Sequence, residues 1–131
     1  MEVLRVHVNL TGFHEVVSEK GTIRMLPFDG MVDGPFFKGT ILSGAADTQK
    51  GAPDGSGSLS ARYVIEGVDC EGNPCKMFIE NNAPFNAPTV PDIVTDSPVL
   101  KWLETAELQG RLEFPDGKIE IVIETLGTED V

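Results

Sequence analysis

The chain is poor in basic residues and has no cluster of them. Its 10 lysines and arginines stand against 21 aspartates and glutamates, which gives a net charge of −11 over 131 residues. A protein that binds nucleic acid or an anionic membrane needs grouped lysines and arginines to replace counterions. The sequence therefore argues against both partners, and we expect the acidity to serve solubility.

Long apolar runs are also missing. No stretch of about 18 apolar residues occurs, so no transmembrane helix is expected. The first residues, Met1 to Val6, lack the basic region and the apolar run of a signal peptide. The cytoplasm is therefore the expected location.

Cysteine is scarce, with only Cys70 and Cys75 in the chain. Two free thiols beside a turn are the simplest interpretation. A disulfide across a hairpin end fits the spacing, but a cytoplasmic compartment argues against it. A metal site would need further ligands, and His7 and His14 are distant in sequence. No cofactor is expected.

Turn-forming residues are frequent, with 14 glycines and 9 prolines that separate short segments. Residues 3–10 and 58–66 alternate between apolar and polar side chains, which predicts half-buried strands. The alternation is clearest in residues 106–114 and 118–124, on either side of Pro115-Asp116-Gly117. This last pair is predicted to be a β-hairpin.

Further extended segments are expected at residues 22–28, 36–42 and 76–80. Pro27 interrupts the first of them and favours an edge or bulge there. Gly39 lies in the middle of the second and predicts a bend or a close backbone approach.

The segments between these strands are rich in glycine, proline and polar residues. Residues 47–57 are expected to form a mobile loop. Residues 81–92 hold three prolines and are expected to cross irregularly. Residues 97–103 are predicted to form one turn of helix, with Ser97 as its N-cap.

The length suits one domain spanning residues 1–131. We predict an all-β fold of seven to eight strands and no long amphipathic helix. Closing the sheet as a small antiparallel β-barrel would bury one face of each strand and remove exposed edges. A β-sandwich is the alternative.

An ordered set of landmarks resembles the uncharacterised protein family 0311, also called domain of unknown function 3237. The resemblance covers roughly residues 5–125. Two landmarks depart from the family. It usually shows Gly-Gly-Ala-Asp-Trp where this chain has an extra alanine and lacks the tryptophan, and it usually shows Asn after Trp-Leu where this chain has Glu104. The landmarks are Gly21-Thr22-Ile23-Arg24, Gly34-Pro35, Gly39, Gly44-Ala45-Ala46-Asp47, Ala61-Arg62-Tyr63, Asp69 with Gly72, Thr95 and Trp102-Leu103.

This resemblance implies a small all-β barrel of the allene-oxide-cyclase-like or calycin-like kind. It implies no established reaction and supplies no catalytic residue. Candidate site residues therefore have to come from physical chemistry.

The first candidate is an arginine–carboxylate pair. If Ala61 and Tyr63 face the core, Arg62 faces solvent; in the opposite register it would point inward and need a carboxylate partner. Asp47 and Glu80 are the expected partners, since Glu80 lies on the predicted return strand.

Three other residues are candidates for ligand binding. Arg24 has the same ambiguity of direction as Arg62. Tyr63 either packs by its ring with its hydroxyl at the rim or acts as a general acid. Trp102 either fills the core or stacks on a ligand.

The histidines and two asparagines are less specific indicators of a site. His7 lies on the polar face of the first strand and is expected to be solvent-exposed, while the direction of His14 is open. The amides of Asn81 and Asn82 end a predicted strand, where they would either bind a ligand or cap a turn.

Several catalytic motifs are missing: a nucleophile elbow, a phosphate-binding glycine loop and a His-x-x-x-His zinc pair. Three hypotheses remain. The first is a barrel that binds a small, mainly apolar organic molecule. The second is a cofactor-independent isomerase, cyclase or lyase that uses a buried carboxylate and an arginine. The third is a structural module that forms a homodimer through residues 36–42 and 108–114.

Overall fold

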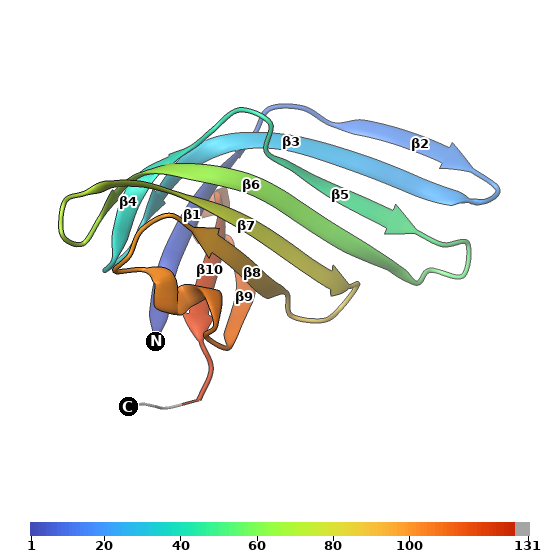
Figure 1. Ribbon diagram of the computed structural model, residues 1–131. Helices are drawn as coiled ribbons and strands as arrows, with labels where there is room; N and C mark the ends of the chain where they lie inside the picture. The colour runs from blue at the N-terminus through green and yellow to red at the C-terminus, as the bar shows by residue number, and fades with distance from the viewer. Residues whose placement is uncertain (128–131) are drawn as a thin grey trace.

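The computed structural model describes residues 1–127 and is all-β (Figure 1). It contains no helix within those residues that is long and apolar enough to cross a membrane. In chain order the elements are β1 (Glu2–Leu10), β2 (His14–Ser18), β3 (Gly21–Asp33), β4 (Phe37–Ile41), β5 (Ala46–Gly51), β6 (Gly57–Asp69), β7 (Pro74–Pro84), β8 (Val90–Thr95), the 3-10 helix η1 (Lys101–Glu104), β9 (Leu108–Glu113), the 3-10 turn η2 (Pro115–Gly117) and β10 (Ile119–Thr125).

All the strands belong to one antiparallel sheet. Its main path runs β8-β7-β6-β4-β3-β1-β10-β9, with β2 paired to β3 and with β5 between β3 and β6. The two ends of this path meet at a single bridge between Thr89 and Gly110, whose amides each donate to the other residue's carbonyl oxygen at 3.3 and 3.0 Å. This bridge, which we call the seam, closes the sheet into a barrel-like shape.

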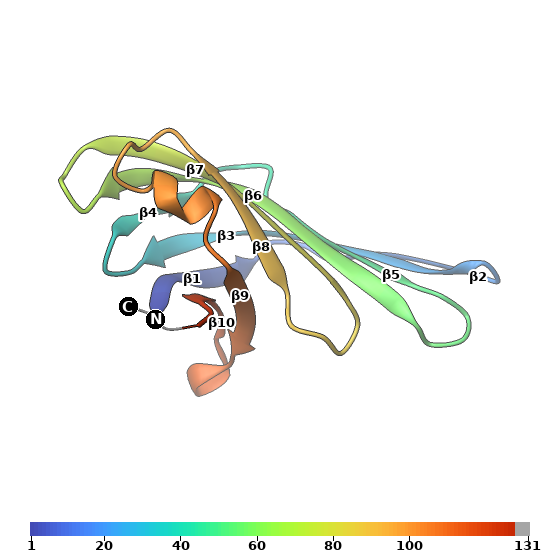
Figure 2. The same cartoon turned by 60° about the horizontal axis from the view of Figure 1, so that its bottom comes forward.

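Two strands are longer than the barrel and change partners along their length. The first half of β3 pairs with β2 and β5, and its second half pairs with β1 and β4. β6 likewise pairs with β5 at its start and β4 at its end. The outer halves project from the barrel with β2 and β5 (Figure 2). We call this part, residues 14–18, 21–27, 46–51 and 57–62, the projecting sheet.

The core lies on the inner face of the barrel, where period-two alternation places the apolar side chains. Leu4 and Val6 of β1, Ile65 of β6, Ile79 of β7 and Ile123 of β10 are fully buried. Burying large aliphatic side chains stabilises the fold by about 1.5–3 kcal/mol each. The alternation seen in the sequence is therefore the source of the core, and the predicted C-terminal hairpin is present as β9 and β10.

Residues 1–127 form ten strands, above the seven to eight expected. β5 occupies the first part of residues 47–57, expected to form a loop, and residues 81–92, expected to be irregular, hold the end of β7 and the start of β8. β5 is hydrogen-bonded on both sides, and pairing with two neighbours outweighs weak strand propensity.

Pro27 does not end β3. Its carbonyl oxygen accepts the Thr11 amide at 2.9 Å, while the next amide, that of Phe28, donates to Ala45 at 3.1 Å. The proline therefore lies where β3 changes partners, at a position that needs no amide donor.

The close backbone approach predicted at Gly39 is confirmed. Gly39 of β4 faces Gly67 of β6 across the ladder. A Cβ atom at Gly39 would overlap the Glu66 carbonyl oxygen, and one at Gly67 would overlap the Lys38 carbonyl oxygen. β4 and β6 therefore lie so close together at this pair that only glycine fits at both positions.

Both cysteines are free thiols. Cys70 is exposed in the turn between β6 and β7, and Cys75 is buried at the start of β7. Of the three interpretations of the two cysteines, the structure agrees with free thiols beside a turn.

Candidate functional site

A pocket of about 620 Å³ opens between the projecting sheet and the end of the barrel. Its walls are mostly apolar: Val8 from β1, Leu26 and Phe28 from β3, Leu59 from β6 and Ile121 from β10. A concave, mainly apolar space of this size is typical of sites for small organic molecules.

A row of three cross-strand neighbours crosses one wall of this pocket. Asp47 of β5 is opposite Ala61 of β6, which in turn is opposite Asn81 of β7. Paired residues in an antiparallel sheet point to the same face, so all three side chains face the pocket. Ala61 carries only a methyl group, which leaves free space between the two polar side chains.

Two oxygen atoms in this row lack hydrogen-bond partners. Asp47 Oδ1 and Asn81 Oδ1 are both buried and unpaired, and Asn81 is only 2% exposed. Asp47 Oδ2 accepts the Gln49 side-chain amide at 3.0 Å, which fixes the carboxylate. Leaving a buried acceptor unpaired costs about 1–3 kcal/mol, so such atoms need an explanation. Both are acceptors, and a ligand that donates hydrogen bonds would satisfy them.

Tyr63 lies in the next inward row, beneath Asn81. Its ring packs edge-on against Phe28, with centroids 5.4 Å apart, and its hydroxyl is buried without a well-formed hydrogen bond. Burial raises the pKa of the Tyr63 phenol well above its usual range, and the adjacent Asn81 side chain offsets only part of that rise. The phenol therefore stays protonated at neutral pH.

Arg62 and Glu80 lie on the opposite, outer face of the sheet. Their side chains are 3.7 Å apart, and the Arg62 side chain is 65% exposed. Of the two registers considered for Arg62, the structure has the solvent-facing one, so this arginine does not meet Asp47. An exposed ion pair of this length contributes little to stability.

Arg24 and Trp102 are also outside the pocket lining. Arg24 is on the inner face of the projecting sheet, opposite Gln49 in the ladder, and its Nε is 2.7 Å from a Glu15 carboxylate oxygen. Trp102 belongs to η1, is 39% exposed and packs edge-on against Phe36. Of the six candidate residues, Asp47 is the one that lines the pocket.

Gln49 and Asn81 also line the pocket. The sequence did not indicate Gln49, and it left Asn81 open between binding a ligand and capping a turn. Gln49 lies in β5, which has the composition of a loop, and Asn81 lies beyond the expected end of β7. A signal was present for Asn81: Met77 and Ile79 are buried at alternate positions, and extending that period by two reaches Asn81.

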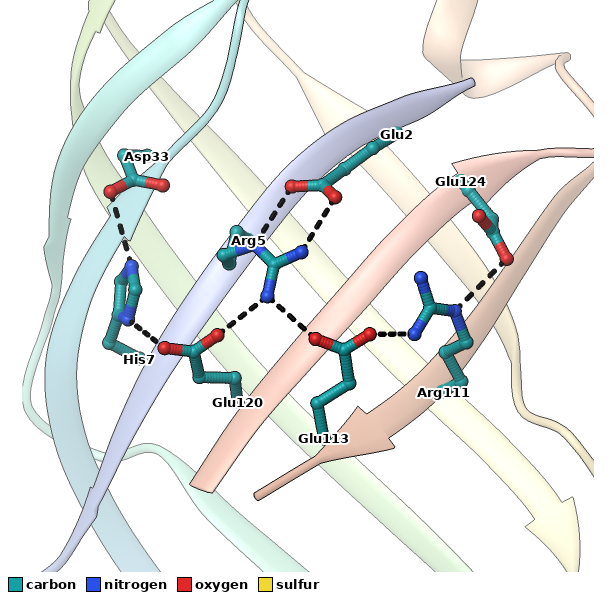
Figure 3. Close-up of polar contacts among 8 residues, drawn as sticks. All are labelled: Glu2, Arg5, His7, Asp33, Arg111, Glu113, Glu120 and Glu124. Carbon is teal, nitrogen blue, oxygen red and sulfur yellow. Dashed lines mark hydrogen bonds and ion pairs between the residues drawn. The ribbon is translucent and has the colours of Figure 1, made fainter. Parts of the chain in front are cut away.

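A second polar cluster covers the outer face of β1, β9 and β10 (Figure 3). Arg5 is its centre and contacts Glu2, Glu113 and Glu120 at 2.8, 2.9 and 2.6 Å. Hydrogen bonds that Arg5 donates to Glu2, Glu113 and Glu120 raise the pKa of Arg5 above its usual range, so it stays charged.

The cluster extends on both sides of Arg5. His7 lies between Glu120, 3.0 Å from its Nδ1, and Asp33, 3.1 Å from its Nε2, while Arg111 contacts Glu113 and Glu124. Within residues 1–127 no group of three or more histidine, cysteine or acidic side chains is placed to hold a metal ion. Because the cluster joins β1, β3, β9 and β10 across their outer face, we assign it a role in stability.

The family comparison agrees with this architecture. A family described as "Protein of unknown function (DUF3237)" matches residues 2–73, which is more than half of the chain. The chain belongs to this family. A UPF0311 protein of Clostridium acetobutylicum is 30% identical over 115 residues, covering 72% of this chain and 69% of that protein.

Solved structures share the fold. A beta-barrel like protein from Acinetobacter baumannii superposes with a TM-score of 0.76 at 18% identity, covering 96% of this chain and 94% of that one. An enzyme from Penicillium herquei gives a TM-score of 0.73 at 16% identity, covering 95% and 92%. At these identities the likeness concerns the fold alone.

Proposed function

We propose that this protein binds a small, mainly apolar organic molecule that carries a hydrogen-bond donor. The observation that carries the proposal is the pair of unpaired acceptors, Asp47 Oδ1 and Asn81 Oδ1, on the wall of an apolar pocket of about 620 Å³. The apolar walls favour a hydrocarbon body by removing its surface from water. A hydroxyl or amine group over Ala61 would meet the acceptors.

This arrangement also sets the selectivity. A site with unpaired buried acceptors favours a ligand that donates to them over an analogue that cannot. The preference for a donor group is therefore expected to exceed what a purely apolar pocket would show.

The test uses two bicyclic probes of similar size, 2-naphthol and 2-methoxynaphthalene, of which only the first donates a hydrogen bond. Calorimetric titration is expected to give at least about tenfold tighter binding of 2-naphthol, corresponding to one buried hydrogen bond. The isosteric variant Asn81→Leu should lose most of this preference, while Arg62→Ala on the outer face should keep it. No binding of either probe, or equal binding by the native protein, would count against the proposal.

A second candidate function is proton transfer by Asp47 without a cofactor. The supporting observation is that Asp47 resembles an oriented base: Gln49 holds one carboxylate oxygen at 3.0 Å, and the other faces the pocket side without a partner. One structural neighbour described as an enzyme shows that this fold is compatible with catalysis. Arg62 has no part in this candidate, because it lies on the other face.

An enolisable bicyclic ketone, 2-tetralone, separates the two functions. In D₂O, Asp47 would take a proton from the carbon beside the carbonyl, and a deuteron would return to that carbon. NMR is expected to show exchange faster than in buffer alone, and Asp47→Asn should abolish the acceleration without abolishing binding. If 2-tetralone binds and its exchange is not accelerated, this candidate is rejected and the binding function stands.

A further inference from the structure

The edge strand β2 has a free side. Its five residues pair with β3, from His14 opposite Met25 to Ser18 opposite Gly21, and with no other strand within residues 1–127. The strand that flanks β1, β10, begins at Ile119 opposite Val8, so nothing continues beside β2. β2 also lacks the lysine, proline or bulge that usually protects such an edge.

Large apolar side chains are exposed around this edge. Val16 and Val17 are 66% and 69% exposed, and Phe13 just before the strand is 59% exposed. On β3, Ile23 lies opposite Val16, and it and Met25 are also exposed. Val16, Ile23 and Met25 share one face of the projecting sheet, and Val17 points to the other. Exposed apolar side chains grouped at an edge in this way mark an interaction surface.

The same region is electrically neutral in a strongly acidic molecule. Residues 11–27 hold two acidic and two basic side chains, so the whole net charge of −11 lies outside them. Glu15 is paired with Arg24 at 2.7 Å. Two copies of this chain would repel each other over most orientations, and an approach through residues 11–27 avoids that repulsion.

We propose that β2 pairs antiparallel with β2 of a second copy, about a two-fold axis that passes Val16. An isologous contact of this kind closes as a dimer and leaves no free edge. The inference does not depend on the proposed ligand, because β2 does not line the pocket.

The backbone suits this register. A two-residue turn joins Ser18 to Gly21, so alternation along the β2–β3 ladder directs the amide and carbonyl groups of Glu15 and Val17 toward the free edge. With the axis at Val16, Glu15 of one copy lies opposite Val17 of the other. The two Glu15 carboxylates are therefore not opposed, and the two Val16 side chains meet on the outer face.

The experiment is sedimentation velocity of the full chain over a range of concentrations. The native protein is expected to show twice the 14.1 kDa of one chain at high concentration. Val16→Lys places two lysines against each other and should shift the protein to monomer. Val94→Lys, a similarly exposed valine of β8, is the matched control and should leave the dimer intact. A native protein that stays monomeric, or a dimer that Val16→Lys leaves unchanged, overturns the proposal.

Hydrogen exchange of the native protein provides a test that needs no variant. The amides of Glu15 and Val17 should exchange at least about tenfold more slowly at a concentration where the dimer forms than at one where it does not. Equal exchange at both concentrations would overturn the pairing through β2, whether or not a dimer forms elsewhere.

Discussion

Asp47 and Arg62 point to opposite faces of one sheet, although their strands are neighbours. Asp47 is directly opposite Ala61, so the next residue, Arg62, must face the other way. Asp47 therefore has no contact with Arg62 on the pocket side of the sheet, and Arg62 pairs with Glu80 on the outer face. In the proposed function the unpaired oxygen atoms recognise hydrogen-bond donors, and leaving them unpaired destabilises the empty protein.

Asn81→Leu is predicted to make the empty protein more stable. The change removes a buried, unpaired amide oxygen and adds apolar contact, which should raise the free energy of unfolding by about 1 kcal/mol. Urea unfolding measures it. Asn82→Leu, on the outer face, is the control and should change the value by less than about 0.5 kcal/mol. A destabilised Asn81→Leu would show that this amide has a structural role.

Gly67→Ala and Gly110→Ala are predicted to differ sharply. A Cβ at Gly67 would overlap the backbone carbonyl of Lys38, which cannot move without breaking the ladder. We therefore expect Gly67→Ala to lower the free energy of unfolding by about 3 kcal/mol or more. A Cβ at Gly110 meets the side-chain hydroxyl of Thr89, which can rotate away. That loss should be about 1 kcal/mol. The double variant Gly110→Ala/Thr89→Ala should recover it in thermal unfolding, and failure to recover would place the strain in the backbone.

Asp69→Ala is predicted to destabilise the β6–β7 turn. Its Oδ1 accepts the amides of Glu71 and Asn73 at 3.0 and 3.1 Å, and its Oδ2 accepts the Ser97 hydroxyl at 2.8 Å. Losing the carboxylate leaves three donors unpaired, so the Tm should fall by roughly 5 °C or more. Asp92→Ala, on exposed β8, should leave the Tm nearly unchanged. Equal Tm values for the two variants would contradict the role of Asp69.

The outer cluster is predicted to make stability depend on acid pH. Hydrogen bonds from Arg5 and Arg111 lower the pKa of Glu113 below its usual 4.5. Because the folded state holds this proton more weakly than the unfolded state, the contribution is complete above about pH 4.5 and is lost as pH falls through the lower, folded value. Urea unfolding from pH 7 to pH 3 should therefore show a steeper decline for the native protein than for Glu113→Gln. Glu107→Gln should keep the native slope, and parallel curves for all three proteins would refute the assignment.

The sequence predicted the features that depend on local side-chain pattern. The strands of the core, the C-terminal hairpin and the close approach at Gly39 follow from side-chain pattern and from the lack of a Cβ, and the structure has all three. Family membership was also visible in the ordered landmarks. These features depend on local residues.

What the sequence could not supply depends on pairing between distant strands. β5 became a strand because β3 and β6 flank it, although its composition favours a loop. Which face Asp47 shares with Asn81 is set by the register of three strands, which no local pattern reveals.

Which strands form free edges of the sheet also depends on pairing between distant strands. Residues 36–42 do not form a sheet edge, because β4 is paired on both sides. β9 pairs with β10 and meets β8 only at the seam, so the dimer contact expected at residues 108–114 stays a prediction. Within residues 1–127, β2 has a fully free edge, which the alternation did not indicate.

The seam is narrower than the ladders of the sheet within residues 1–127. One bridge joins Thr89 to Gly110, whereas β6 and β7 share eleven residue pairs. Both seam residues line the pocket. Separating Thr89 from Gly110 breaks two hydrogen bonds and leaves every long ladder intact. We therefore expect local opening of the barrel to begin at the seam. A guest molecule would then enter and leave sideways, and the strength of this one bridge would set its residence time.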